Sequence, residues 1–155
     1  MEASQAQLAT DIALIAYLLI IFGSGTLSDK VGRRRMLLTA CVAFIVLSIP
    51  CFLMLGTASL PIVIVAELIM CVTLSLNDAN IACYQAEMFP TEVRYTGAAL
   101  GSNIAYVVFG GTASFVAPGN GLMPAFYMMA ISAVAGVILF FTAHDYNGIP
   151  LDEIR

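Results

Sequence analysis

The chain has 155 residues, of which 61% are hydrophobic and only 10% are charged. Ordinary soluble domains contain about 25% charged residues, so this composition excludes a soluble globular fold. The formal net charge of −4 says little about partners, because the placement of Lys and Arg, rather than net charge, orients a membrane protein. We therefore expect the lipid bilayer as the main partner and no nucleic acid.

Five long apolar runs dominate the sequence. A membrane-spanning helix needs about 20 consecutive, mostly apolar residues. The runs near 6–25, 36–56, 61–85, 97–117 and 123–143 all reach this length. They predict an all-α integral membrane protein with five transmembrane helices in a single domain over residues 1–155.

The basic residues all fall on one side of this predicted topology. They are Lys30, Arg33, Arg34 and Arg35 after the first run, Arg94 after the third and Arg155 after the fifth. Cytoplasmic loops carry the excess of Lys and Arg in membrane proteins. We therefore expect a multi-pass plasma membrane protein with its N-terminus outside and its C-terminus in the cytoplasm.

The first connection, SGTLSDKVGRRRML (Ser24–Leu37), holds four of the six basic residues. Gly25 and Gly32 lie within it, and glycine lets helix ends approach closely and adopt unusual backbone angles. Asp29 precedes the arginine run, and guanidinium groups pair with carboxylates in a fixed geometry. We expect a tight hinge with a functional charge cluster, the alternative being a basic loop that only fixes topology.

Three acidic residues fall inside the apolar runs, where ionisable side chains are rare and default to functional hypotheses. Asp11 lies near the outer end of the first run, and Glu67 and Asp78 lie in the third. At about 100° per residue, eleven positions return to within roughly 20° of the same direction, so Glu67 and Asp78 share a helix face. That face could line a path for protons or substrate, with Asp78 as the first choice. The alternative is hydrogen bonding between helices.

The second connection on the basic side, YQAEMFPTEVRYTGAALG (Tyr84–Gly101), places Glu87 and Arg94 on either side of Pro90. Proline breaks a helix, so we expect the acid to end one span and the base to begin the next. Both can then face the Arg33–Arg34 cluster of the first connection. This arrangement predicts a shared layer of opposite charges.

The fourth run contains two kinds of feature. Gly97 and Gly101 have GxxxG spacing, which favours close helix packing. Ser102, Asn103 and Tyr106 follow within about one turn and could bind a polar solute. Bonding between helices or a position at the membrane interface explains these polar residues about equally well.

No pattern for metal, cofactor or enzyme chemistry is present in the sequence. The four cysteines lie in apolar runs without the paired spacing of a zinc or redox site, so we expect them to pack as small apolar residues. The only histidine, His144, has no second ligand nearby. Aromatic residues such as Tyr17 and Tyr127 are expected to pack or to anchor the spans at the interface. We expect no cofactor, no metal and no enzymatic activity.

Two of these stretches together resemble a known family. The stretch GTLSDKVGRRR (Gly25–Arg35) is similar to the G-x-L-x-D-[RK]-x-G-[RK]-[RK] loop of major facilitator superfamily transporters. Glu87 and Arg94 match the E-x6-R pair of the sugar-porter and metabolite–proton symporter branches of that superfamily. The longer string AEMFPTEVRYTG, followed by FGGTASFVAP, is most similar to bacterial metabolite–proton symporters, the branch that includes proline/betaine and 2-oxoglutarate permeases.

This resemblance implies a fold and a partner. The loop occurs once and only two spans follow the E-x6-R connection, so the five spans align with spans eight to twelve of the family. They would form most of the C-terminal half of a major facilitator fold, and the missing N-terminal half would be a partner of this chain.

The resemblance also implies a cytoplasmic gate, in which Asp29 would attract the positive end of a helix in the opposite half. The gate residues are Gly25, Asp29, Gly32, Arg33, Arg34, Glu87 and Arg94. The candidates for the proton or substrate pathway are Glu67, Asp78, Asn103 and Tyr106.

We therefore expect a fragment of a secondary transporter in the bacterial inner membrane. It would move a small polar metabolite by alternating access, with proton-coupled symport as the expected mode. Two alternatives stay open. A facilitative sugar porter shares the loop and the E-x6-R pair, and a truncated or non-transporting membrane scaffold would explain the missing half.

Overall fold

The computed structural model describes residues 3–57, 59–116 and 121–142, which contain helices and no strand. The helices are, in chain order, α1 (Ala3–Val31), α2 (Arg33–Leu55), α3 (Leu60–Met88), α4 (Arg94–Ala105), η1 (Tyr106–Gly110), α5 (Gly111–Val116) and α6 (Met123–Thr142). The turn η1 is π-helical, and α4, η1 and α5 follow one another without a break as a single span. Five helical segments of the described chain are long and apolar enough to cross a membrane, which confirms the predicted all-α membrane class.

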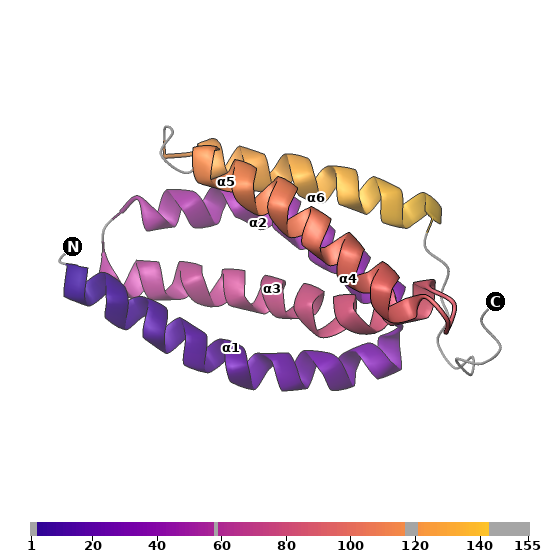
Figure 1. The fold of residues 1–155 in the computed structure, drawn as a ribbon. Coiled ribbons are helices and arrows are strands. Elements are labelled where there is room, and N and C mark those ends of the chain that lie inside the picture. Colours follow the sequence, from indigo (N-terminus) through magenta and orange to yellow (C-terminus); the bar gives the residue numbers. More distant parts are fainter. Residues whose placement is uncertain (1–2, 58, 117–120, 143–155) are drawn as a thin grey trace.

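The helix α3 is central to the bundle. It packs against both α1 and α2, and α6 packs against α2. The α4–α5 segment crosses the bundle diagonally (Figure 1). Its α4 part contacts α3, and its α5 part contacts α6. Consecutive helices run in opposite directions, so the α1–α2 and α3–α4 connections and the end of α6 lie at one end of the molecule (Figure 1).

The basic residues that the structure describes all lie at this same end, which we call the basic end. Lys30 lies in the last turn of α1, Arg33–Arg35 open α2, and Arg94 opens α4. The clustering expected from the sequence is therefore present in three dimensions for these residues.

The turn between α1 and α2 consists of a single residue. Gly32 has φ 99° and ψ 134°, a positive-φ conformation that residues with a Cβ rarely adopt. Its N–H donates to the Ser28 carbonyl at 2.9 Å, and its carbonyl accepts from the Met36 N–H at 3.2 Å. The predicted spans, 6–25 and 36–56, left residues 26–35 as a connection, but α1 continues to Val31 because no proline interrupts its backbone hydrogen bonds.

The break between α3 and α4 falls around Pro90, as predicted. The helix α3 ends at Met88, and α4 begins at Arg94. Between them Phe89 is extended, with φ −109° and ψ 137°. A residue that precedes proline is pushed out of the helical region, which explains this conformation.

The fourth span is only loosely held by the described bundle, because α4, η1 and α5 contribute no buried residue. Gly97 packs closely within the chain, since a Cβ built there would lie 2.6 Å from the Phe89 ring. Gly101, its GxxxG partner, has open space around it instead. Gly97 therefore packs against the α3–α4 connection, and the described chain does not test the close helix packing predicted from this spacing.

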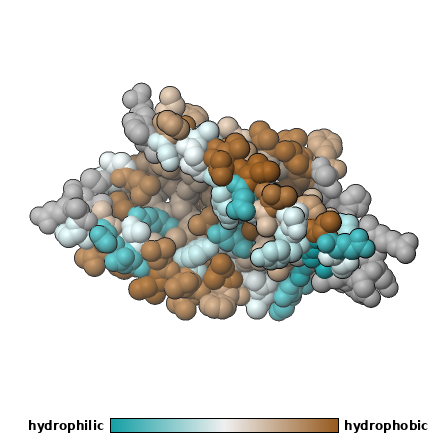
Figure 2. Space-filling model, in the orientation of Figure 1, coloured by the Kyte–Doolittle hydropathy of each residue, from teal (hydrophilic) through white to brown (hydrophobic). Residues whose placement is uncertain are grey.

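One face of the bundle carries a hydrophilic band between apolar surfaces (Figure 2). The band crosses the middle of the molecule in front of α3 and α4, and apolar surfaces of α1 and α6 border it (Figures 1 and 2). Leu19 and Phe22 of α1 and Phe141 of α6 are 72%, 76% and 80% exposed. Such apolar surfaces suit contact with lipid, whereas a polar band suits contact with water or another protein surface.

We predict that Gly32→Ala destabilises the bundle by about 1–3 kcal/mol, the usual cost of a residue held in a disfavoured backbone region. The matched control is Gly25→Ala. Gly25 lies inside α1 with open space around it, so alanine should be neutral or slightly stabilising there. Thermal unfolding in detergent, followed by circular dichroism, measures the difference. Equal melting temperatures for the two variants would contradict the single-residue turn.

Candidate functional site

A line of polar contacts, the α1–α3 polar seam, joins these two helices along most of their length. From the N-terminal end of α1, the contacts are Thr10 to Glu67, Cys71 to the Ala13 carbonyl, Tyr17 to Asp78, Ser24 to the Ser75 carbonyl, and Ser28 to Asn80. The residues on α1 recur every three, four or seven positions, which is the spacing of one helix face. The seam contains both acids that were predicted to share a face of the third span.

Asp78 has both carboxylate oxygens hydrogen-bonded. The Tyr17 hydroxyl donates to Oδ2 at 2.8 Å, and the Asn77 amide donates to Oδ1 at 3.1 Å. Tyr17 was expected to pack or to anchor the span at the membrane interface, and its bond to Asp78 was not predicted. The signal that could have found it is the spacing on α1, where Tyr17 lies seven positions from both Thr10 and Ser24 and so shares their face.

Glu67 is less completely satisfied than Asp78. The Thr10 hydroxyl lies 3.3 Å from Glu67 Oε1 but shares its single proton with the Ala6 carbonyl at 3.2 Å, while Glu67 Oε2 is buried and has no hydrogen-bond partner among the described residues. The carboxyl group lines a cavity of about 280 Å³ between α1, α2 and α3, whose walls also include Leu14, Phe52 and Met70. Burying a polar oxygen without a partner is costly. This oxygen is therefore open to a donor, whether a proton, a water molecule or a solute.

Towards the basic end, the seam contacts made by α1 involve neutral side chains. Ser24 Oγ donates to the Ser75 carbonyl at 3.0 Å, and Ser28 Oγ donates to Asn80 Oδ1. The Asn80 amide in turn donates to the Leu76 carbonyl at 2.6 Å, and Asn80 is fully buried. Hydroxyl and amide groups commonly join helices in this way inside membranes. These neutral contacts, which were not predicted from the sequence, hold α1 against α3.

The helix α4 reaches the same face of α3 at Gln85. Ser102 Oγ donates to Gln85 Oε1 at 3.1 Å, and Gln85 lies seven positions after Asp78, on the same helix face. Asn103 and Tyr106 are exposed, Tyr106 at 75%. Of the three polar residues singled out in this span, Ser102 therefore bonds between helices, and the other two are accessible from outside the described bundle.

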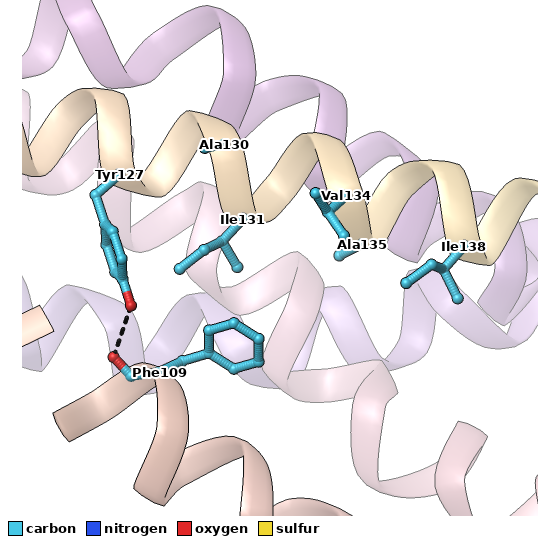
Figure 3. A pocket seen from close by; sticks show the side chains of 7 residues that line it. All are labelled: Phe109, Tyr127, Ala130, Ile131, Val134, Ala135 and Ile138. Carbon is cyan, nitrogen blue, oxygen red and sulfur yellow. Dashed lines mark hydrogen bonds between the residues drawn. The ribbon is translucent and has the colours of Figure 1, made fainter. Parts of the chain in front are cut away.

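Tyr106 begins the π-helical turn that ends at Gly110. Such turns are rare, and they occur frequently at functional sites. The Tyr127 hydroxyl of α6 donates to the Phe109 carbonyl at 3.0 Å (Figure 3). The Tyr127 ring lies beside the apolar side chains that line the cavity between η1 and α6 (Figure 3). Tyr127 was expected to pack or to anchor the span, and it also binds the irregular turn to α6.

At the basic end, two arginines bind the ends of neighbouring helices. Arg34 Nη2 donates to the Phe140 carbonyl, in the last turn of α6, at 2.8 Å. Arg94 Nε donates to the Phe89 carbonyl, just after α3, at 3.2 Å. Carbonyl groups at a helix end lack partners within the helix, so a guanidinium satisfies them and complements the helix dipole. Arg34 thus ties α2 to α6.

The acidic residues of the proposed gate are described only in part. Asp29 Oδ1 lies 3.9 Å from Arg33 Nη2, and the Asp29 side chain is 73% exposed, so this pair contributes little to stability. The side chain of Glu87 lies outside the described part of the structure, as do residues 143–155 with His144. The pairing of Glu87 with the arginines therefore stays a prediction.

The described residues contain no group of three or more His, Cys, Asp or Glu side chains that could hold a metal ion. All four cysteines are free. Cys41 and Cys51 are buried, as expected for packing residues, whereas Cys83 is exposed.

A family model, that of the Major Facilitator Superfamily, matches residues 1–151 of this chain. The match includes all five apolar helices, both sides of the polar seam and the basic end. The chain therefore belongs to the Major Facilitator Superfamily, and it is a multi-pass membrane protein. No solved structure gives a significant match.

Curated relatives of the chain are named as transporters, in agreement with the predicted branch and with the expectation of no enzyme. The chain is 34% identical, over 90% of its length, to the ectoine/proline transporter ProP of Corynebacterium glutamicum, of which it covers 29%. It is 34% identical, over 82% of its length, to the proline/betaine transporter of Escherichia coli strain K12, of which it covers 26%. The chain thus spans less than a third of the length of these relatives.

We predict that Tyr17 and Asp78 are energetically coupled. A double-mutant cycle with Tyr17→Phe and Asp78→Ala, measured by unfolding in detergent, should give a coupling free energy of about 0.6 kcal/mol, with about 1.7 kcal/mol as the upper bound for bonds between membrane helices. The control cycle pairs Asp78→Ala with Tyr127→Phe, which removes a hydroxyl bonded elsewhere and should be additive. A Tyr17–Asp78 cycle as additive as the control would show that this bond does not hold α1 against α3.

Proposed function

We propose that this chain is the C-terminal part of a secondary transporter that moves a small zwitterionic solute by alternating access, coupled to protons. The observation that carries the proposal is the intramembrane carboxyl group of Asp78, which Tyr17 holds from another helix on the face that also presents Glu67. The transporter lies in a bacterial plasma membrane, with the N-terminus of this chain outside and its basic end in the cytoplasm.

In this proposal, Asp78 couples proton binding to helix packing. The ionised carboxylate accepts a charge-assisted hydrogen bond from Tyr17, and such bonds are roughly twice as strong as bonds between neutral groups. Protonation of Asp78 therefore weakens the contact between α1 and α3 in the middle of the membrane. Glu67, whose Oε2 has no partner among the described residues, is the second proton site.

The proposed solute class follows from the names of the relatives and from the side chains on the polar face. Proline, betaine and ectoine each combine a positively charged nitrogen-containing group with a carboxylate in a small molecule. Asp78 and Glu67 offer negative charge to the nitrogen end, and Asn103 and Tyr106 offer hydrogen-bond donors to the carboxylate. These names favour zwitterionic solutes over sugars, which makes the facilitative sugar porter the weaker alternative.

The proposed cytoplasmic gate lies at the basic end. It comprises Gly25, Asp29, Gly32, Arg33, Arg34, Glu87 and Arg94. The exposed Asp29 carboxylate would attract the positive N-terminal end of a helix in the N-terminal half. The contact of Arg34 ties α2 to the end of α6, and that of Arg94 fixes the α3–α4 connection, which would help these helices to move together.

The N-terminal half of the transporter is the proposed partner for the uncovered polar face. The fourth span contributes no buried residue, and its Asn103 is exposed. A polar side chain in contact with lipid is costly, whereas a second bundle would enclose it beside a water-filled path. Alternating access by two bundles that rock around a site between them has this geometry.

In the complete transporter, Asp78→Asn is expected to abolish the accumulation of proline or betaine against a concentration gradient, because an amide cannot bind and release a proton. Exchange of labelled solute without a gradient should survive. Vesicle uptake under an imposed pH gradient and counterflow in the same vesicles measure the two activities.

The matched control is Asp11→Asn, which makes the same chemical change at an exposed acid near the outer end of α1 and should leave accumulation intact. Full accumulation by Asp78→Asn would remove Asp78 from the mechanism and assign the proton to Glu67.

The chain produced alone is expected to insert into membranes without showing saturable uptake, because five helices supply less than one six-helix half of the alternating-access design. The purified chain is reconstituted in vesicles, its orientation is checked by protease accessibility, and uptake of proline, betaine, ectoine and hexoses is measured under a pH gradient. Robust saturable uptake by this chain alone would contradict the need for a second half, and would mean that several copies assemble the pathway.

A further inference from the structure

An apolar groove runs between α2 and α6, away from the α1–α3 polar seam. It has a volume of about 330 Å³, and its walls include Leu38, Val42 and Ile45 of α2 and Gly136, Val137 and Phe141 of α6. Val42, Val137 and Phe141 are 60%, 57% and 80% exposed, so the groove is open to its surroundings. The groove has the apolar lining and the open side that a hydrocarbon chain needs.

Two arginines lie at the basic end of this groove. Arg34 lies four positions before Leu38 and eleven before Ile45, which places it on the same stripe of α2 as the groove wall. Its Nη2 bonds to the carbonyl of Phe140, which lines the opposite wall, while its Nε is buried without a partner among the described residues. Arg35 is exposed and lies seven positions before Val42 of the groove wall, on the same face of α2. Positive charge and apolar surface therefore adjoin at one end of the groove.

We propose that this groove binds an anionic phospholipid, with one acyl chain between α2 and α6 and the phosphate at Arg34 and Arg35. Guanidinium groups match the geometry of phosphate and bind it through charge-assisted hydrogen bonds. The two arginines also lie in the first turn of α2, where the helix dipole favours an anion. Basic pockets between transmembrane helices bind anionic lipid head groups in this way.

The bound lipid would brace α2 against α6, because Arg34 already holds the last turn of α6. Its phosphate would bind the exposed guanidinium of Arg35 beside Arg34, and its acyl chain would fill the groove. This inference uses neither the transported solute nor the second half of the transporter, so it stands apart from the proposed function.

Native mass spectrometry of the full chain tests this site, with the chain extracted in detergent together with equal amounts of phosphatidylglycerol and phosphatidylcholine. One phosphatidylglycerol should be retained in preference to phosphatidylcholine. Arg35→Gln should weaken this retention about fivefold, the usual contribution of one basic residue to anionic lipid binding. Val137→Trp fills the groove without changing the charge and should abolish retention.

The matched control for charge is Lys30→Gln, which removes one positive charge from the same end of the bundle but on α1, outside the groove. If it weakens retention as much as Arg35→Gln, general surface charge holds the lipid and the site does not exist. Retention unaffected by a folded Val137→Trp, or displacement of the lipid by excess soluble glycerophosphate, would overturn the role of the groove. Arg34→Gln is unsuitable as the main variant because it also removes the contact between α2 and α6.

Discussion

Hydrocarbon offers no hydrogen-bond partner, so each polar group within a membrane span must bind inside the protein or face water. This chain meets that constraint mainly along one helix pair, α1 and α3, whose hydroxyls, amides, carbonyls and two carboxyls bond to one another. The α2–α6 contact, by contrast, rests on apolar side chains and on the bond from Arg34 to the end of α6. Specific hydrogen bonds therefore fix the position of α1 relative to α3 more than that of α6 relative to α2.

The contacts along the polar seam are of two kinds, neutral and ionisable. The contact nearest the basic residues, between Ser28 and Asn80, is neutral and buried, so it does not change with pH. The contacts of Thr10 with Glu67 and of Tyr17 with Asp78 involve carboxyl groups, and Asp78 lies on α3 between Ser75 and Asn80. Under the proposed function, protonation would alter the packing at these two carboxyl groups while the Ser28–Asn80 contact stays joined.

Hydropathy and helix periodicity are local, so they were enough to predict the five spans, the break at Pro90 and the common face of Glu67 and Asp78. The partners across helices were harder, because a single sequence does not say which faces meet. Tyr17 was missed for this reason. The α1–α2 hinge was predicted too long, because polar residues next to a membrane span were taken as loop, although only Gly32 leaves the helical conformation.

The π-helical turn at Tyr106–Gly110 has a consequence for the geometry of the fourth span. One extra residue in a turn offsets everything after it by about 100° relative to a regular α-helix. A single helical wheel therefore cannot represent this span, since side chains that it superimposes from α4 and α5 point in different directions. An alignment of this span with a relative that lacks the turn must allow a one-residue insertion here. Without it, residues after the turn would be matched to residues on a different face of the relative's helix.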